Sequence, residues 1–140
     1  APRPCFLGWM IANIRRGEGT LFQDEYRSPV YVDDLCQAIL AACETRAPRV
    51  YHIGGPDRLS RYDFGQLVAE VFSLPKENVK GGRVADTALR ALRPADVSLD
   101  ISRAVRELSW NPRPCREGLE FLCRRGYYQP EQTSAAGEES

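Results

Sequence analysis

Several features that mark whole classes of protein are absent from this chain. No apolar run approaches the roughly 20 residues that a membrane-spanning helix needs, which predicts no membrane association. The 19 basic side chains equal the 19 acidic ones, whereas nucleic-acid-binding proteins usually carry a net positive face, which predicts no nucleic-acid partner. The basic-then-apolar leader of secreted proteins is missing too. Together these absences predict a globular protein of the cytoplasm.

Cysteines with metal-ligand spacing are also absent. None of the five cysteines forms a C-x-x-C pair, and an odd number does not suit a framework of disulfides. Cys36 and Cys43 are seven residues apart, Cys115 and Cys123 are eight apart, and both spacings share one helix face. We therefore predict that these four and Cys5 are reduced core residues, and that the chain has no metal site.

Apolar periodicity and turn signals predict helices that alternate with short strands, the pattern of the α/β class. Helices are expected at residues 6–16, from Asp33 or Asp34 to before Pro48, from Ser60 to Pro75, at 100–108 and around 119–122. Short strands are expected at 21–22, 30–32 and 50–53, with a bend at Gly81 and Gly82. We predict one incomplete domain over residues 1–128. The small, polar and acidic residues 129–140 predict a disordered tail.

Three sequence phrases follow one another in a fixed order. The first is Arg-Ser-Pro-Val-Tyr-Val-Asp-Asp-Leu at 27–35, and the second is Val-Tyr-His-Ile-Gly-Gly at 50–55. The third is Arg-Pro-Ala-Asp-Val-Ser-Leu-Asp at 93–100, which Leu-Ser-Trp-Asn-Pro follows at 108–112. Together they resemble the C-terminal, substrate-binding half of the extended short-chain dehydrogenase/reductase superfamily. Ser109 stands where this superfamily often has glycine.

Within this superfamily, the chain looks most similar to the dTDP-4-dehydrorhamnose reductases and to the regulatory β subunit of methionine adenosyltransferase. The features that carry this similarity are Pro29, Arg93 followed by Pro94, and Phe-Ser-Leu-Pro at 72–75. The resemblance implies an α/β fold that is the C-terminal portion of an NAD(P)-binding Rossmann-like protein, with few short strands and about five helices.

In complete members of the superfamily, the N-terminal half binds NAD(P) through a Gly-rich turn and carries a Tyr-x-x-x-Lys pair for acid–base chemistry. This sequence contains neither feature, and its lysines, Lys76 and Lys80, do not follow a tyrosine at that spacing. We therefore predict a fragment that lacks the N-terminal half. It is expected to contain no catalytic and no cofactor-binding residue, and not to bind NAD(P) alone.

Arg27 and Arg93 are the predicted substrate-binding residues. The resemblance implies that both contact the diphosphate of a nucleotide-sugar. A planar, permanently charged guanidinium pairs with phosphate through two donors at once. The structural alternative is that Arg27 pairs with Asp24 or Glu25, and Arg93 with Asp96.

Other residues also have both a functional and a structural interpretation. Asp34 is predicted to cap a helix rather than to act as a catalytic carboxylate. His52, the single histidine, is predicted to be a satisfied core residue rather than a ligand or a base. Ser60 is predicted as a helix N-cap and Trp110 as a core residue. Gly54 and Gly55 are predicted to reverse the chain rather than to bind phosphate.

Two functions are consistent with these features. The first is the substrate-binding part of an NAD(P)-dependent sugar-nucleotide reductase or epimerase, which takes a nucleotide-sugar and is inactive alone. The alternative is a regulatory module that resembles the methionine adenosyltransferase β subunit and binds a protein partner. The fold does not distinguish them, because one fold can carry either role.

Overall fold

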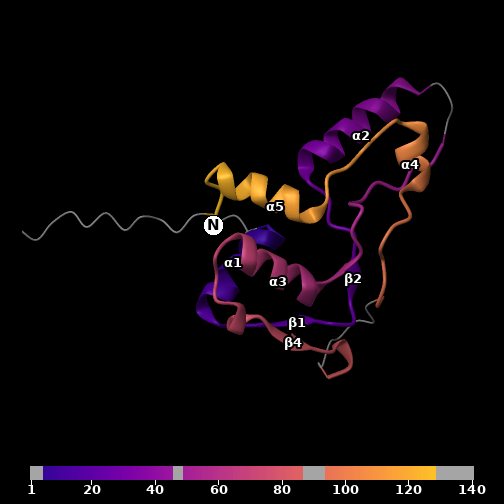
Figure 1. Ribbon diagram of the computed structural model, residues 1–140. Coiled ribbons are helices and arrows are strands. Elements are labelled where there is room, and N and C mark those ends of the chain that lie inside the picture. The colour runs from indigo at the N-terminus through magenta and orange to yellow at the C-terminus, as the bar shows by residue number, and fades with distance from the viewer. Residues whose placement is uncertain (1–4, 46–48, 87–93, 129–140) are drawn as a thin grey trace, which may run out of the picture.

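The structure, a computed structural model, describes residues 5–45, 49–86 and 94–128 (Figure 1). Arg93 and the predicted tail at 129–140 lie outside these residues. The helices are α1 (Phe6–Arg16), α2 (Val32–Glu44), α3 (Arg61–Val71), α4 (Ser102–Glu107) and α5 (Cys115–Arg124), with 3-10 turns at Lys76–Asn78 and Val84–Asp86. The strands are β1 (Thr20–Phe22), β2 (Tyr26–Arg27), β3 (Leu59–Ser60) and β4 (Lys80–Gly82). Within the described residues, the predicted α/β mixture of helices with few short strands is confirmed.

The strands form two small pairs. β1 lies parallel to β4, with Leu21 opposite Gly81, and β2 lies antiparallel to β3. The strand predicted at 21–22 is therefore confirmed, but the bend predicted at Gly81 and Gly82 is wrong, because both glycines belong to β4. Glycine suits this strand because a Cβ atom on Gly82 would meet Thr20 Cγ2 at 2.4 Å.

Two other predicted strands do not form. Residues 30–31 lead directly into α2, which already includes Val32. Residues 50–53 are in no strand pairing with any described segment, and Val50 is 74% exposed. Val30, Tyr51 and Ile53 are partly buried against the smaller core, but a strand also needs a neighbouring strand for its backbone hydrogen bonds, and the described residues offer these segments none.

The larger core lies between α1, α3, α5 and β1 (Figure 1). Its buried side chains include those of Met10 and Ile11 from α1, Leu21 from β1, Val68 from α3 and Leu119 from α5. These positions recur at helical spacing in α1 and α3, which is why periodicity alone predicts both helices.

Local capping signals also act as predicted. Gly17 ends α1 with φ 67°, a left-handed conformation that glycine adopts without strain. Ser60 begins α3: its hydroxyl accepts the backbone N–H of Asp63 at 3.0 Å, and the Asp63 carboxylate accepts the backbone N–H of Ser60 in return. This capping box places α3 immediately after β3.

A second, smaller core joins α2 and α4. Its buried residues are Ala38, Ala104, Leu108 and Trp110. Trp110 is 4% exposed and donates its indole N–H to the backbone oxygen of Asp34 at 2.8 Å, which confirms it as a core residue. Only a narrow face of α2 contacts this core, so Ile39 and Leu40 are more than half exposed.

The prediction of core cysteines is wrong for three of the five free thiols. Cys115 is buried and Cys123 is half-buried, whereas the exposed cysteines are Cys5, Cys36 and Cys43. α2 faces its core through Ala38. A residue two positions away, such as Cys36, lies on nearly the opposite side of the helix. A shared helix face therefore did not mean a buried one.

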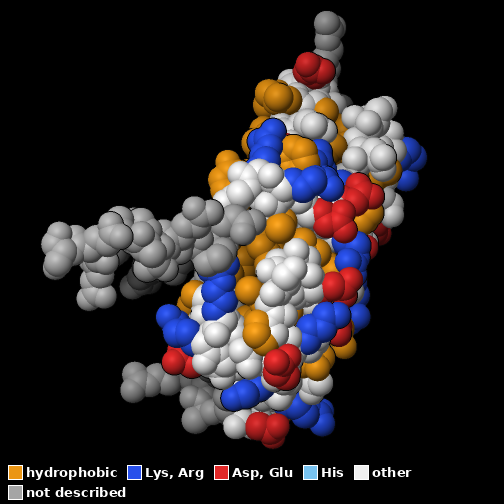
Figure 2. All heavy atoms as spheres, turned by 60° about the vertical axis from the view of Figure 1, so that its left-hand side comes forward, with side chains coloured by type: hydrophobic (Ala, Val, Ile, Leu, Met, Phe, Trp, Pro, Cys, Tyr) orange, Lys and Arg blue, Asp and Glu red, His pale blue; other side chains and the backbone are white. Residues whose placement is uncertain are grey.

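Surface charge is mixed on the face shown in Figure 2. Basic and acidic side chains are interspersed there with apolar ones, so no block of one sign forms on this face. Within the described residues, no helix has the length and apolarity to cross a membrane. The same residues contain no group of three or more side chains that could hold a metal ion.

Candidate functional site

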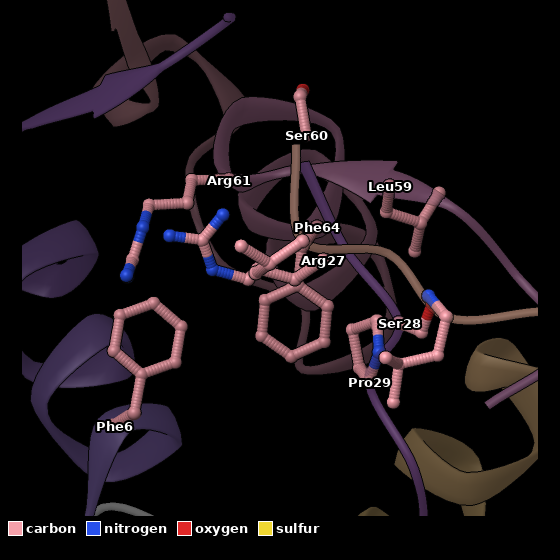
Figure 3. A pocket seen from close by; sticks show the side chains of 10 residues that line it. Phe6, Arg27, Ser28, Pro29, Leu59, Ser60, Arg61 and Phe64 are labelled. Atoms are coloured by element: carbon pink, nitrogen blue, oxygen red, sulfur yellow. The ribbon is translucent and has the colours of Figure 1, made fainter. Parts of the chain in front are cut away.

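A cavity of about 450 Å³ lies where α1, β2 and the β3–α3 junction meet residues 97–99 (Figure 3). Small-molecule sites typically measure about 300–1,000 Å³. The lining residues are Phe6, Arg27, Ser28, Pro29, Leu59, Ser60, Arg61, Phe64, Val97 and Leu99. Two of them carry guanidinium groups, and most of the others are apolar.

The predicted residue Arg27 lies in this cavity. Its Nη1 donates a hydrogen bond to the backbone oxygen of Tyr26 at 2.6 Å, and its Nη2 is 3.1 Å from a carboxylate oxygen of Glu25. Glu25 is 0% exposed. The alternative ion pair with Glu25 is therefore present, and it keeps the guanidinium at the cavity. A guanidinium has five N–H donors, so this pairing does not exhaust its capacity to bind a ligand.

Arg61 brings a second guanidinium, which the sequence interpretation missed. It is the first residue of α3 and pairs with the other carboxylate oxygen of Glu25. Its guanidinium carbon lies 4.7 Å from the centre of the Phe6 ring. A buried carboxylate requires compensation by opposite charge, and β2 and α3 each supply an arginine for Glu25. The available signal was that Arg61 follows the predicted N-cap Ser60, which fixes it at the start of the helix.

Aromatic and aliphatic side chains form the remaining walls. The rings of Phe6 and Phe64 are stacked, with centroids 6.2 Å apart and planes at 17°. Further apolar lining comes from Pro29, Leu59, Val97 and Leu99. Such a cavity can accept a ligand with a planar or apolar part beside an anionic part, because the walls suit the first and the guanidinium groups the second.

The other predicted substrate residue, Arg93, lies outside the described residues, so its predicted role is not tested. Its suggested partner Asp96 pairs with Arg58, with 2.8 Å between Nη2 and Oδ2. Hydrogen bonds from Ser98, and then from Arg58, lower the pKa of the Asp96 carboxyl to about 2. Asp96 is therefore an anion at neutral pH and is already engaged.

The prediction that Asp34 caps a helix is wrong. α2 begins at Val32 after Tyr31, with no side-chain cap, and the buried Asp34 carboxylate accepts hydrogen bonds from Arg113. Both the backbone N–H and Nε of Arg113 donate to it at 3.0 Å. Asp34 thus ties the start of α2 to the chain before α5, because a charged partner from a distant segment replaced the local backbone donors.

The prediction of a core histidine is also wrong, since His52 is exposed. It borders a polar surface hollow with Asp100, Arg103 and Arg106. Near it, the close approach of two backbone segments accounts for Gly55. Its N–H donates to the backbone oxygen of Ser28 at 3.2 Å, and a Cβ atom there would lie 1.7 Å from the backbone oxygen of Pro29. The predicted N-cap Ser60 is confirmed.

Comparison with known proteins gives a family and a set of similar structures. The family described as RmlD substrate binding domain matches residues 5–127. The chain is similar to dTDP-4-dehydrorhamnose reductase (rfbD) from Bacillus anthracis str. Ames in complex with NADP, with TM-score 0.75 and 23% identity, covering 89% of this chain and 44% of that one. No curated protein matches.

Two further structures are similar. A hypothetical dTDP-4-dehydrorhamnose reductase from Sulfolobus tokodaii has TM-score 0.67 and 32% identity, covering 84% of this chain and 42% of that one. UDP-glucuronic acid 4-epimerase from Bacillus cereus in complex with NAD has TM-score 0.60 and 21% identity, covering 91% of this chain and 37% of that one.

The chain thus spans less than half the length of each of these structures. Two of them are complexes with NADP or NAD, and the likeness confirms that this chain has the α/β fold of a portion of a Rossmann-like protein. The family match extends from before α1 to beyond α5 and includes the whole cavity. The chain therefore belongs to the RmlD substrate-binding-domain family.

Proposed function

We propose that this chain is the substrate-binding part of an NAD(P)-dependent sugar-nucleotide reductase or epimerase, inactive by itself. The observation that carries the proposal is the position of Arg27 at one cavity with stacked aromatic side chains. A nucleotide-sugar has a planar base and a diphosphate. The aromatic walls suit the base, and the guanidinium suits the diphosphate through paired N–H donors.

The charges around the guanidinium groups of the cavity favour binding of an anion. Arg27 and Arg61 contribute two positive charges against the one negative charge of Glu25. Glu25 holds both guanidinium groups in place, so an anionic ligand meets donors that are already oriented. In this proposal Arg27 contacts the diphosphate directly, and Arg93 is the second contact that the family resemblance implies.

The residues of this chain do not fit NAD(P) themselves. Among the described residues, the two direct connections from a strand to an α-helix, β2–α2 and β3–α3, lack a glycine: residues 28–31 read Ser-Pro-Val-Tyr, and Ser60 is followed at once by Arg61. A dinucleotide pyrophosphate requires a Gly-rich turn before a helix N-terminus. We therefore propose that cofactor and catalytic residues come from another part of the whole protein.

Substitution of Arg27 tests the proposal. In the whole protein, Arg27→Ala is expected to weaken binding of a dTDP-sugar by about 1–3 kcal/mol, as for other charge-assisted hydrogen bonds, and to leave NAD(P) affinity unchanged. Arg27→Lys keeps the positive charge beside Glu25 but loses the planar fork of donors. It should therefore preserve the fold and still weaken binding of the dTDP-sugar. Arg93→Ala should behave like Arg27→Ala.

Isothermal calorimetry measures these affinities. The matched control is Arg116→Ala, because Arg116 lies on α5, pairs with Glu70 at 2.7 Å and does not line the cavity. Unchanged dTDP-sugar affinity in both Arg27 variants would overturn the assignment of the diphosphate to this residue.

The second candidate is a regulatory module like the methionine adenosyltransferase β subunit. The exposed side chains of Ile39 and Leu40 on α2 favour it, because such residues suit contact with another protein. Titration of the chain with the catalytic subunit of methionine adenosyltransferase, followed by ultracentrifugation, separates the candidates. Complex formation that Leu40→Lys abolishes would support regulation, and dTDP-sugar binding that depends on Arg27 would support the first proposal.

A further inference from the structure

Arg58 connects three segments that are distant in the sequence. It precedes β3, and its guanidinium carbon lies 3.6 Å from the centre of the Tyr26 ring in β2. The same guanidinium reaches Asp96, with Nε at 2.9 Å and Nη2 at 2.8 Å from one carboxylate oxygen. The arginine is therefore stacked on one segment and ion-paired with another.

The segment that contains Asp96 forms one wall of the cavity. Its Val97 and Leu99 side chains line the cavity and are 40% and 41% exposed. Three hydrogen bonds attach the segment to β2 and the residue after it. The Tyr26 N–H donates to the Ala95 backbone oxygen at 2.7 Å, the Val97 N–H donates to the Tyr26 oxygen at 3.2 Å, and the Leu99 N–H donates to Ser28 Oγ at 3.1 Å.

We propose that Arg58 is a positioning residue of the cavity, which holds residues 95–99 against β2 and so fixes the wall formed by Val97 and Leu99. This wall lies beside Arg27, because its hydrogen bonds are made with Tyr26 and Ser28, the two residues that flank Arg27 in the chain. The inference deepens the proposed function, since it names a residue that shapes the site without lining it. The part that concerns ligand affinity rests on that function, whereas the position of the wall does not.

The chemistry of arginine suits this role. An exposed ion pair alone usually contributes little, but here the charged group is also stacked on an aromatic ring, which fixes its orientation. Asp96 is fixed from its own side as well, because its other carboxylate oxygen accepts the Ser98 N–H at 2.9 Å. Lysine would keep the charge but lacks the planar group that stacks on a ring and the rigid fork that fixes two donors toward one carboxylate.

Amide hydrogen exchange on the full chain without ligand tests the position of the wall. In Arg58→Ala, exchange at the amides of Val97 and Leu99 should rise about 3- to 30-fold, from the combined loss of the ion pair and the stacking. The amide of Gln23, which donates to the Gly82 oxygen at 2.9 Å, should not change. Arg58→Lys should restore less than half of the lost protection.

A double substitution and a remote control separate positioning from general stability. In an Asp96→Asn background, Arg58→Ala should raise the exchange rate of the Val97 amide by a smaller factor than it does in the wild type. Arg116→Ala, which removes a different surface ion pair, should leave both wall amides as in the wild type. Unchanged exchange in Arg58→Ala, or an equal rise at Gln23, would overturn the proposal.

Calorimetry with dTDP then connects the wall to the site. Weaker dTDP binding in Arg58→Ala, with wild-type exchange at Gln23, supports a positioning role in binding. If the wild type does not bind dTDP but the exchange pattern holds, the proposed function fails and the positioning of the wall stands. If dTDP binds and the wall amides do not respond to Arg58→Ala, the positioning role fails and the proposed function stands.

Discussion

Glu25 and Asp34 are carboxylates that the fold buries almost completely, and each depends on arginine. Glu25 pairs with Arg27 and Arg61, and Asp34, at 2% exposure, pairs with Arg113. Removing one partner of a buried pair leaves a charge without compensation, which costs more than the pair itself contributes. Arg27, Arg61 and Arg113 therefore stabilise the fold by neutralising buried carboxylates. Arg27 has the proposed binding role in addition.

Ser109 provides a prediction at the residue scale. Its φ is 48°, a left-handed conformation that costs a non-glycine residue energy, and the family resemblance implies glycine there. Ser109→Gly should raise the free energy of unfolding by about 0.5–1 kcal/mol, after allowance for the greater freedom of glycine in the unfolded chain. Urea denaturation measures the change.

Ser102→Gly is the matched control for this prediction. Ser102 is the first residue of α4, where glycine has poorer helix propensity. Ser102→Gly should therefore lower the free energy of unfolding. Equal or lower stability in Ser109→Gly would show that the left-handed conformation carries no cost at this position.

Among the described elements, α3 contacts α1, α5, β1 and β3; it begins at the cavity and ends near α5. Its capping box sets its start, and Val68 and Ala69 bury its inner face in the larger core. At its C-terminal end, the Glu70 carboxylate forms two ion pairs, one with Lys76 Nζ at 3.0 Å and one with Nη1 of Arg116 in α5 at 2.7 Å. The helix thus holds Arg61 at the cavity from one end while the other end is joined to α5.

The contact between α3 and α5 should depend on pH. Hydrogen bonds from Arg116, and then from Lys76, lower the pKa of Glu70 from 4.5 to about 2. Because the folded pKa is the lower one, the ionised carboxylate stabilises the fold fully above about pH 5, and this contribution is lost as the pH falls toward about 2. The melting temperature of Glu70→Gln should therefore fall less than that of the wild type over this range.

Thermal melts at several pH values measure this difference. High salt should reduce it, since all three groups are exposed and screened. Identical pH profiles for the wild type and Glu70→Gln would show that the two ion pairs do not contribute to stability.

At the scale of the whole molecule, the described residues form two separate hydrophobic cores and two short strand pairs rather than one core around a continuous sheet. Large apolar side chains remain exposed, among them Val32, Ile39 and Leu40 on α2. Single exposed apolar residues are common in proteins, but several on one helix mark a surface that suits a protein contact. This agrees with a chain that spans less than half of the structures it resembles.

The chain alone should not bind NADPH with low-micromolar affinity. The physical reason is the lack of a Gly-rich turn whose backbone N–H groups could surround the pyrophosphate at a helix N-terminus. Titration of the chain with NADPH, followed by its fluorescence, measures this, and a complete RmlD-like reductase serves as the positive control. A saturable signal at low micromolar concentration would contradict the prediction.

The sequence by itself determined the features that depend on near neighbours or on periodicity. The α/β class, the end of α1 at Gly17, the capping box of Ser60 and the burial of Trp110 all follow from residues a few positions apart or from apolar spacing. The family resemblance added Arg27, which the structure places at the cavity.

Only the tertiary structure decided which charges meet. Arg61 is 36 residues from Glu25, and Arg113 is 79 residues from Asp34, so no local pattern connects them. β4 likewise exists because β1 lies beside it, although its two glycines favour a bend. The physical reason is the same in each case: an ion pair or a strand pairing is made with whatever group the folded chain brings within reach, and sequence distance does not limit that choice.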